Sequence, residues 1–130
     1  MSKLKLTGRI PSKKNSKIIS CRGKRPMLFP SKKHKEWHKE ASEELMKQKP
    51  PQGIEKCEVI LIFTPPDKRA FDLTNKAESI MDLLVDNKII LDDNYKVVYS
   101  VILQVKEPDK EKAGCVICLN INGSIFDIYN

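Results

Sequence analysis

The sequence has no acidic residue before Glu36, no long apolar run and no low-complexity tract. A membrane-spanning helix needs about 18 to 20 consecutive apolar residues, and no stretch of this chain comes near that length. The opening letters, MSKLKLTGR, include charges but no apolar centre, so we expect no secretory signal peptide. Together these absences predict a cytoplasmic protein with no membrane partner.

The chain also lacks internal repeats and any sign of a second domain. Its 130 residues match the usual size of one domain, which buries about two-thirds of the surface that the unfolded chain exposes. A hydrophobic content of 40% is typical of a globular protein. The four cysteines would be reduced thiols in the cytoplasm. They are Cys21, Cys57, Cys115 and Cys118.

Charge is distributed unevenly along the chain. Residues 1–35 contain twelve lysines and arginines and no acid, so this basic N-terminal region carries +12; the rest carries −5, because the whole chain carries +7. A segment with this much positive charge indicates a polyanionic partner, most commonly nucleic acid. A solvated basic surface is the other interpretation of the same pattern.

The hydrophobic pattern predicts one α+β domain over residues 1–130, with a mixed or antiparallel sheet and two main helices. Ser31 is a good N-cap for the first helix, which we expect to end near Lys47. The second helix is predicted from about Asp72 to Asp86. The run CEVILIFT, at 57–64, predicts a central strand buried on both faces. The other predicted strands cover 3–9, 18–20, 27–29, 96–106 and 115–121.

The second helix has an acidic face and an apolar face. Only Asp72 has a lysine four residues further on, so repulsion between the other acids is largely uncompensated. Carboxylates gathered in this way suit Mg²⁺ or Mn²⁺, although a polar face is also what any surface helix presents. The acidic region continues to 93, where an Asp-Asp pair follows the helix. The predicted polar side holds Asp72, Asn75, Glu78, Ser79, Asp82 and Asp86; the apolar side holds Leu73, Ala77, Ile80, Met81 and Leu84.

The segment DKRAFDLTNKAESIMDLLVDNKIILDD, at 67–93, resembles the RusA-type Holliday-junction resolvases of phages and bacteria. That family has a basic loop, an Asp-Leu-(Asp or Thr)-Asn motif, a helix with a further Asp about ten residues on, and an Asp-Asp pair before a strand. The segments IPSKKNS and RGKRP resemble the opening of the family. The resemblance extends to about Asn122 and implies a RusA-like endonuclease domain.

The resemblance implies a function in DNA recombination and repair. Members are small homodimers that bind a four-way DNA junction and nick two strands symmetrically, using Mg²⁺ or Mn²⁺. By this resemblance Asp72 matches the first catalytic and metal-binding aspartate, Asp82 the acid on the helix, and Asp93 the last aspartate. Asn75 would order the start of the helix, and Asp92 would support its neighbour.

Two positions depart from the best-known members of the family. Thr74 stands where they carry a second aspartate, and Glu78 stands where they carry a lysine. Glu78 could restore a carboxylate beside the metal. Lys76 could supply the missing cation, but two residues along a helix turn it by about 200°, away from that position.

Basic residues near these motifs are predicted to contact DNA phosphates, which position the DNA without reading its sequence. Phe71, just before Asp72, would either stack on a base at the branch point or anchor the loop in the core. A zinc site is disfavoured for the two histidines and the CxxC pair, because residues three apart in a strand face opposite ways. The phosphate-binding candidates are Lys13, Lys14, Arg22, Lys24, Arg25, Lys68, Arg69 and Lys76; the zinc candidates are His34, His38, Cys115 and Cys118.

Two other functions fit the same residues. One is a non-catalytic or weakly catalytic protein that binds branched DNA, in which the acids are only a solvated helix face. The other is a nuclease for flaps, forks or other branched substrates. The main hypothesis is a crossover junction endodeoxyribonuclease, with Asp72, Asp82 and Asp93, assisted by Glu78, holding the ion.

Overall fold

A computed structural model describes residues 1–13, 17–20 and 27–121, with the backbone alone described for 17–20 and 27–30. It contains one small α+β domain, as the sequence predicts. Four strands form the main sheet and two helices pack on it, while two short strands form a separate hairpin. The elements are β1 (Ser2–Thr7), β2 (Lys17–Ser20), β3 (Met27–Pro30), α1 (Lys32–Lys47), β4 (Cys57–Thr64), α2 (Leu73–Asp86), β5 (Val98–Val105) and β6 (Gly114–Asn120).

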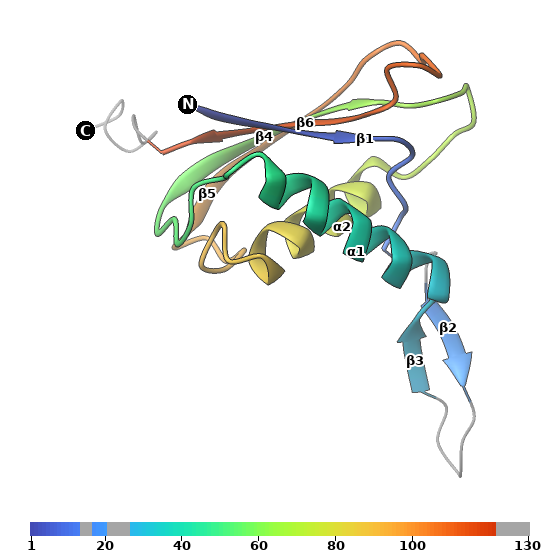
Figure 1. Cartoon of the computed structure of the whole chain (residues 1–130), viewed down its shortest axis with the longest axis horizontal. Helices are drawn as coiled ribbons and strands as arrows, with labels where there is room; N and C mark the ends of the chain where they lie inside the picture. The colour runs from blue at the N-terminus through green and yellow to red at the C-terminus, as the bar shows by residue number, and fades with distance from the viewer. Residues whose placement is uncertain (14–16, 21–26, 122–130) are drawn as a thin grey trace.

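The main sheet is mixed, with strand order β1-β6-β4-β5. β6 runs antiparallel to β1 and to β4, and β4 runs parallel to β5. The crossover between the two parallel strands contains α2, as this topology requires. Both helices lie on the same face of the sheet, and the β2–β3 hairpin projects away from the body (Figure 1).

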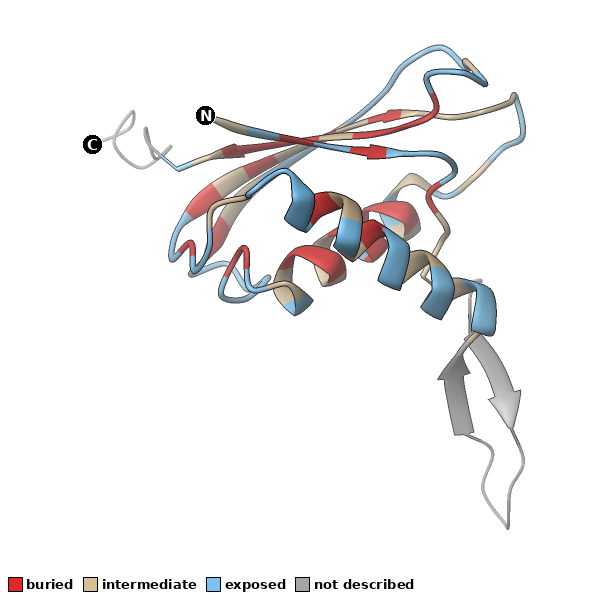
Figure 2. Ribbon diagram, viewed as in Figure 1, coloured by how far each residue is buried: buried red, intermediate tan, exposed pale blue. Residues whose placement is uncertain are grey.

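The prediction that the 57–64 strand is buried on both faces is wrong. Side chains of β4 alternate between buried and half-buried positions. Val59 and Leu61 are fully buried beneath the helices, whereas Ile60 and Ile62 point to the other side of the sheet and are half-buried. The reason is visible in Figure 2, where the helices cover one face of the sheet and no described element covers the other.

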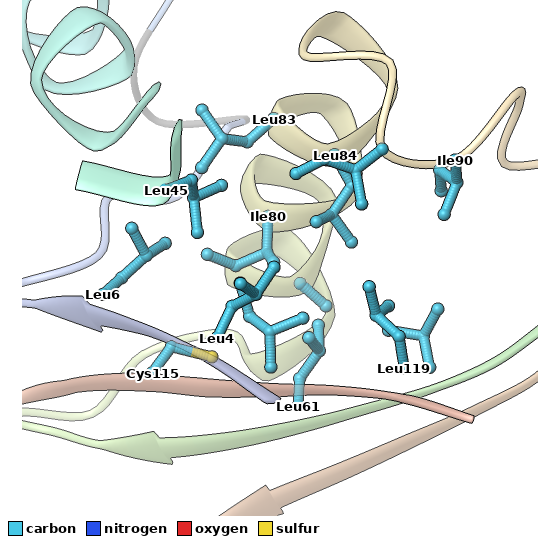
Figure 3. Close-up of a cluster of buried hydrophobic side chains, with 14 of the residues drawn as sticks. Leu4, Leu6, Leu45, Leu61, Ile80, Leu83, Leu84, Ile90, Cys115 and Leu119 are labelled. Carbon is cyan, nitrogen blue, oxygen red and sulfur yellow. The ribbon is translucent and has the colours of Figure 1, made fainter. Parts of the chain in front are cut away.

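The core lies between the sheet and the two helices (Figure 3). α1 contributes Leu45, and α2 contributes Ile80, Leu83 and Leu84, all fully buried. Ser79, predicted on the polar side of α2, is instead buried, because its hydroxyl donates a hydrogen bond to the Pro11 carbonyl at 2.7 Å. The exposed polar side of α2 is therefore narrower than the sequence predicts.

Side chains of α1 close the outer edge of β1. The Lys5 N–H donates to Gln48 Oε1 at 2.9 Å, and Gln48 Nε2 donates to the Lys5 carbonyl at 2.7 Å. Glu44 accepts from the Thr7 N–H at 3.0 Å and from its hydroxyl at 2.8 Å. These side chains take the place of a neighbouring strand and satisfy backbone groups that an edge strand leaves unpaired.

The described helices are all too short or too polar to cross a membrane. Cys57, Cys115 and Cys118 are buried free thiols, as expected for reduced cysteines, and Cys21 lies outside the described residues. Burial raises the pKa of Cys115 to about 12, which keeps that thiol protonated at neutral pH.

Candidate functional site

Asp72 is the N-cap of α2, at the position where the sequence predicts the helix to begin. Its Oδ1 accepts hydrogen bonds from the backbone N–H groups of Thr74 at 3.1 Å and Asn75 at 3.4 Å. The Thr74 hydroxyl also donates to Oδ1 at 2.8 Å. These bonds satisfy donors that the first turn of a helix leaves unpaired, and the helix dipole favours the negative charge there. Asp72 thus has a structural function whatever its chemistry.

Lys13 forms an ion pair with one of the predicted acids, and two others act on it through their charge. Its Nζ is 2.6 Å from Asp82 Oδ2, and its backbone N–H donates to the Asn75 carbonyl at 3.2 Å. The hydrogen bond with Asp82 raises the pKa of Lys13, and the charges of Glu78 and Asp93 raise it further, while burial lowers it. We call Lys13, Glu78, Asp82 and Asp93 the Lys13 cluster. The lysine supplies the compensating charge that the helix itself lacks.

Asp92 shapes the turn that carries Asp93. Its two carboxylate oxygens accept from the Asp93 N–H at 2.7 Å and from Asn94 Nδ2 at 2.9 Å. The hydrogen bond from the Asp93 backbone is the main reason that the pKa of Asp92 lies below its usual value. Asp92 therefore acts as a turn-forming residue.

The geometry of α2 divides the predicted metal ligands into two sets. Asp72 and Asp82 are ten residues apart, which is about 15 Å along a helix axis. A single ion binds carboxylate oxygens at about 2.1 Å, so it cannot bind both residues of one chain. In the described part of the chain, no three His, Cys, Asp or Glu side chains form a group ready to hold a metal. Asp72 and Asp82 of one chain therefore cannot share an ion.

Asp67 joins two basic residues near the start of α2. Arg69 donates to its carboxylate through Nη2 at 3.0 Å and through the backbone N–H at 3.0 Å, and Arg9 Nη2 also donates to it. The hydrogen bonds from Arg69 are the main cause of the strongly lowered pKa of Asp67. The sequence analysis did not single out Asp67. The adjacent lysine and arginine in DKR were the only signal for such a pair.

Lys76 is only 7% exposed, which disfavours the predicted contact of this residue with DNA. Its Nζ lies 4.5 Å from the centre of the Phe71 ring, a favourable cation–π distance. Burial lowers the pKa of Lys76. Phe71 thereby anchors the loop before α2, which favours the anchoring interpretation of that residue over base stacking.

Replacing Lys76 by methionine is expected to leave DNA affinity unchanged within about twofold. Methionine keeps the apolar length of the side chain and removes a partly desolvated charge, so the free energy of unfolding should change by less than about 1.5 kcal/mol. Gel shifts on a four-way junction and urea denaturation measure the two quantities. A large loss of DNA affinity with an intact fold would restore Lys76 to the DNA-binding set.

Of the two histidines of α1, His38 connects the helices and His34 packs within α1. His38 Nε2 and Asp86 Oδ2 are 2.8 Å apart. His34 packs against Trp37 with ring centres 5.6 Å apart, and burial is the main cause of its lowered pKa. Cys115 lies on the helix side of β6, and Cys118 on the other side, as the strand alternation predicts.

The remaining phosphate-binding candidates are of two kinds. Lys68 and Arg69 are exposed in the loop between β4 and α2, close to Asp72 in the sequence. The others lie outside the described residues; these are Lys14, Arg22, Lys24 and Arg25.

The chain matches no protein-family model, and a search of curated proteins gave no significant match. The resemblance to the RusA-type resolvases therefore depends on the motifs and their order alone.

Proposed function

We propose that this protein is a metal-dependent, structure-selective endonuclease that cuts four-way DNA junctions. It acts as a cytoplasmic homodimer, in DNA recombination and repair, and makes paired symmetric nicks. The observation that supports this best is the Lys13 cluster. Asp82 on α2 pairs with Lys13 of the basic N-terminal region, and the charges of Glu78 and Asp93 act on the same lysine.

The charge balance of the Lys13 cluster favours cation binding. Asp82 is paired with Lys13, and the exposed carboxylates of Glu78 and Asp93 also act on that one lysine, so the acids outnumber the cation by two. Like charges near one another repel, and a bound cation relieves that repulsion. On DNA binding, Lys13 would turn from Asp82 to a DNA phosphate and leave Asp82, Glu78 and Asp93 available to a divalent ion. This gives Lys13 the phosphate contact that its sequence position predicts.

Each of the predicted catalytic carboxylates has a role in this mechanism. Glu78, Asp82 and Asp93 would hold Mg²⁺ or Mn²⁺, which would supply an activated water and neutralise charge on the phosphate. The resemblance adds Asp72 to the catalytic set. Because α2 separates it from Asp82 by about 15 Å, Asp72 acts on a different ion or a different part of the DNA. Arg69, beside it, would hold a neighbouring phosphate.

Nicking of a synthetic four-way junction tests the proposed function. With Mg²⁺ or Mn²⁺ we expect paired nicks in opposite strands, with ligatable 5′-phosphate and 3′-hydroxyl ends, and with EDTA we expect none. A fork, a flap and a linear duplex of the same sequence serve as controls for structure selectivity. Equal cleavage of all four substrates would reject selectivity for the four-way junction and favour a general or flap nuclease.

A non-catalytic or weakly catalytic protein that binds branched DNA is the second candidate. Two observations favour it. Thr74 offers Asp72 a hydroxyl where the family carries a second carboxylate, and Lys13 already neutralises part of the acidic face. A junction gel shift without any nicked product in either Mg²⁺ or Mn²⁺ would select this function over the nuclease.

Arg69→Ala is expected to weaken junction binding severalfold at low salt and to reduce the slope of log affinity against log salt by about one. Each phosphate contact releases about one counterion, so its removal lowers the salt dependence by that amount. Lys39→Ala is the matched control, because Lys39 is an exposed cation on α1 away from the predicted surface. Equal slopes for Arg69→Ala and the unmodified protein would remove Arg69 from the contact set.

A further inference from the structure

The outer edge of β5 is apolar, and no strand in the described part of the chain covers it. β5 is the last strand of the main sheet, at the opposite end from β1. Val101 is 45% exposed and Val105 is 46% exposed. The strand reads VYSVILQV and contains no charged residue, in a chain where 32% of residues are charged. Natural proteins usually protect such an edge with charges, proline or a covering element, because it is a template for pairing with another strand.

The two edge strands of the sheet differ in whether side chains bind their outer backbone groups. Side chains from α1, Gln48 and Glu44, occupy the edge of β1 and satisfy its backbone. Within the described ranges, no strand pairs with the outer edge of β5. If the sheet is to grow by addition of a strand, β5 is the edge at which it can do so.

The hydrogen bonds of β5 identify which residues face outward. The Lys106 N–H donates to the Phe63 carbonyl of β4 at 2.8 Å. Backbone direction alternates along a strand, so even-numbered residues direct their N–H and C=O groups toward β4. The odd-numbered residues Val101, Leu103 and Val105 direct theirs away from it. The side chains of these three residues lie on the helix side, since they pair in register with the buried Val59, Leu61 and Phe63.

We propose that two copies of this chain pair through β5, antiparallel, about a two-fold axis at Leu103. Val101 of each copy then lies opposite Val105 of the other, and the two Leu103 residues face each other. The outward backbone groups of all three residues are satisfied in this register. The result is one continuous eight-stranded sheet.

A second copy is the partner that fits this edge. The five residues VILQV have valine at both ends, so the edge is self-complementary under a two-fold rotation, as an isologous contact requires. The absence of charge lets two molecules of net charge +7 meet without local repulsion. A two-fold axis perpendicular to the sheet keeps the helices of both copies on one side. This deepens the proposed function, for which it would place two acidic faces toward one DNA junction.

Charge exchange across the pair tests the register in the absence of DNA. The unmodified protein should sediment at twice its 14.9 kDa chain mass. Val101→Lys with Val105→Lys places lysine opposite lysine at both ends, and should give a folded monomer with at least a tenfold weaker dimer. Val101→Lys with Val105→Glu places opposite charges together and should restore the dimer. Circular dichroism checks that each variant is folded.

A cysteine crosslink gives a second measurement that does not require weakening the dimer. In a Cys21→Ser background, Leu103→Cys should form a disulfide-linked dimer on oxidation, since Cα atoms of a hydrogen-bonded antiparallel pair are about 5.5 Å apart. Ile102→Cys is the matched control and should crosslink at least tenfold less. Its side chain points to the other face, and residue 102 lies opposite 104 of the second copy.

Three results would overturn the pairing. One is an unmodified protein that is monomeric at about 100 µM. Another is equal dimerisation of the two charge variants, which would place the dimer contact elsewhere, for example on the uncovered face of the sheet. The third is a monomer that dimerises only after truncation at Ile121, which would show that residues 122–130 cover the edge. Loss of nicking in a protein that still dimerises would reject the proposed function and leave the pairing intact.

Discussion

Replacing Asp72 by asparagine is expected to abolish junction cleavage, by about 100-fold or more, while junction binding is retained. Asparagine can still accept the hydrogen bonds from the Thr74 and Asn75 N–H groups, so α2 keeps its cap. The negative charge that would bind an ion or orient the attacking water is lost. A factor of this size is typical for removal of one positioned catalytic group. Rates of nicking and gel shifts on the same junction provide the two measurements.

Two further variants determine which acids carry the chemistry. Asp82→Asn should lose cleavage to a similar extent, because Asp82 is the member of the Lys13 cluster that contacts the lysine directly. Asp86→Asn is the matched control on the same helix, since Asp86 pairs with His38, and it should keep most of the cleavage. Persistent cleavage by Asp72→Asn would remove Asp72 from the mechanism. Cleavage lost only in Asp82→Asn would place the whole chemistry in the Lys13 cluster.

Gly114→Ala is expected to cause the largest loss of stability of any single methyl addition considered. Gly114 has φ +151°, and a Cβ there would lie 2.0 Å from the backbone oxygen of Leu6. The neighbouring atoms belong to the backbone of β1, which is held by its pairing with β6, so they cannot move aside cheaply. We expect the free energy of unfolding to fall by about 3 kcal/mol or more, measured from the midpoint of urea denaturation.

Gly8→Ala is the matched control for this effect. Gly8 has φ +84°, so alanine is also strained there, but a Cβ would meet no atom within 4 Å. The expected cost is about 1 to 2 kcal/mol, from the left-handed backbone alone. Equal losses at the two glycines would contradict the argument, because the close approach of β1 distinguishes one position from the other.

Much of the fold follows from local signals in the sequence. Ser31 caps α1 where the pattern predicts it, and its hydroxyl accepts from the His34 N–H at 3.1 Å. β4 has the predicted bounds, and α2 ends at the predicted Asp86. These signals are short-range, because a helix cap or a hydrophobic period of two or 3.6 residues depends only on residues close together in the sequence.

The candidate site was only partly predictable. The sequence predicts that Asp82 and Asp93 lie near each other, and both act on Lys13 in the fold. It also groups Asp72 with them, although the length of α2 separates Asp72 from Asp82. Neighbouring residues in the sequence predict neither the burial of Lys76 nor the ion pairs by which Asp67 links Arg9 and Arg69.

By itself, the sequence determined approximately where the helices and strands lie, and that its acids follow its basic segment. These properties arise from residues adjacent in the chain. Only the tertiary structure decided that both helices cover one face of the sheet, that Ser79 is buried and that Lys13 pairs with Asp82. Each of these depends on contacts between residues far apart in sequence, whose packing partners no local periodicity specifies.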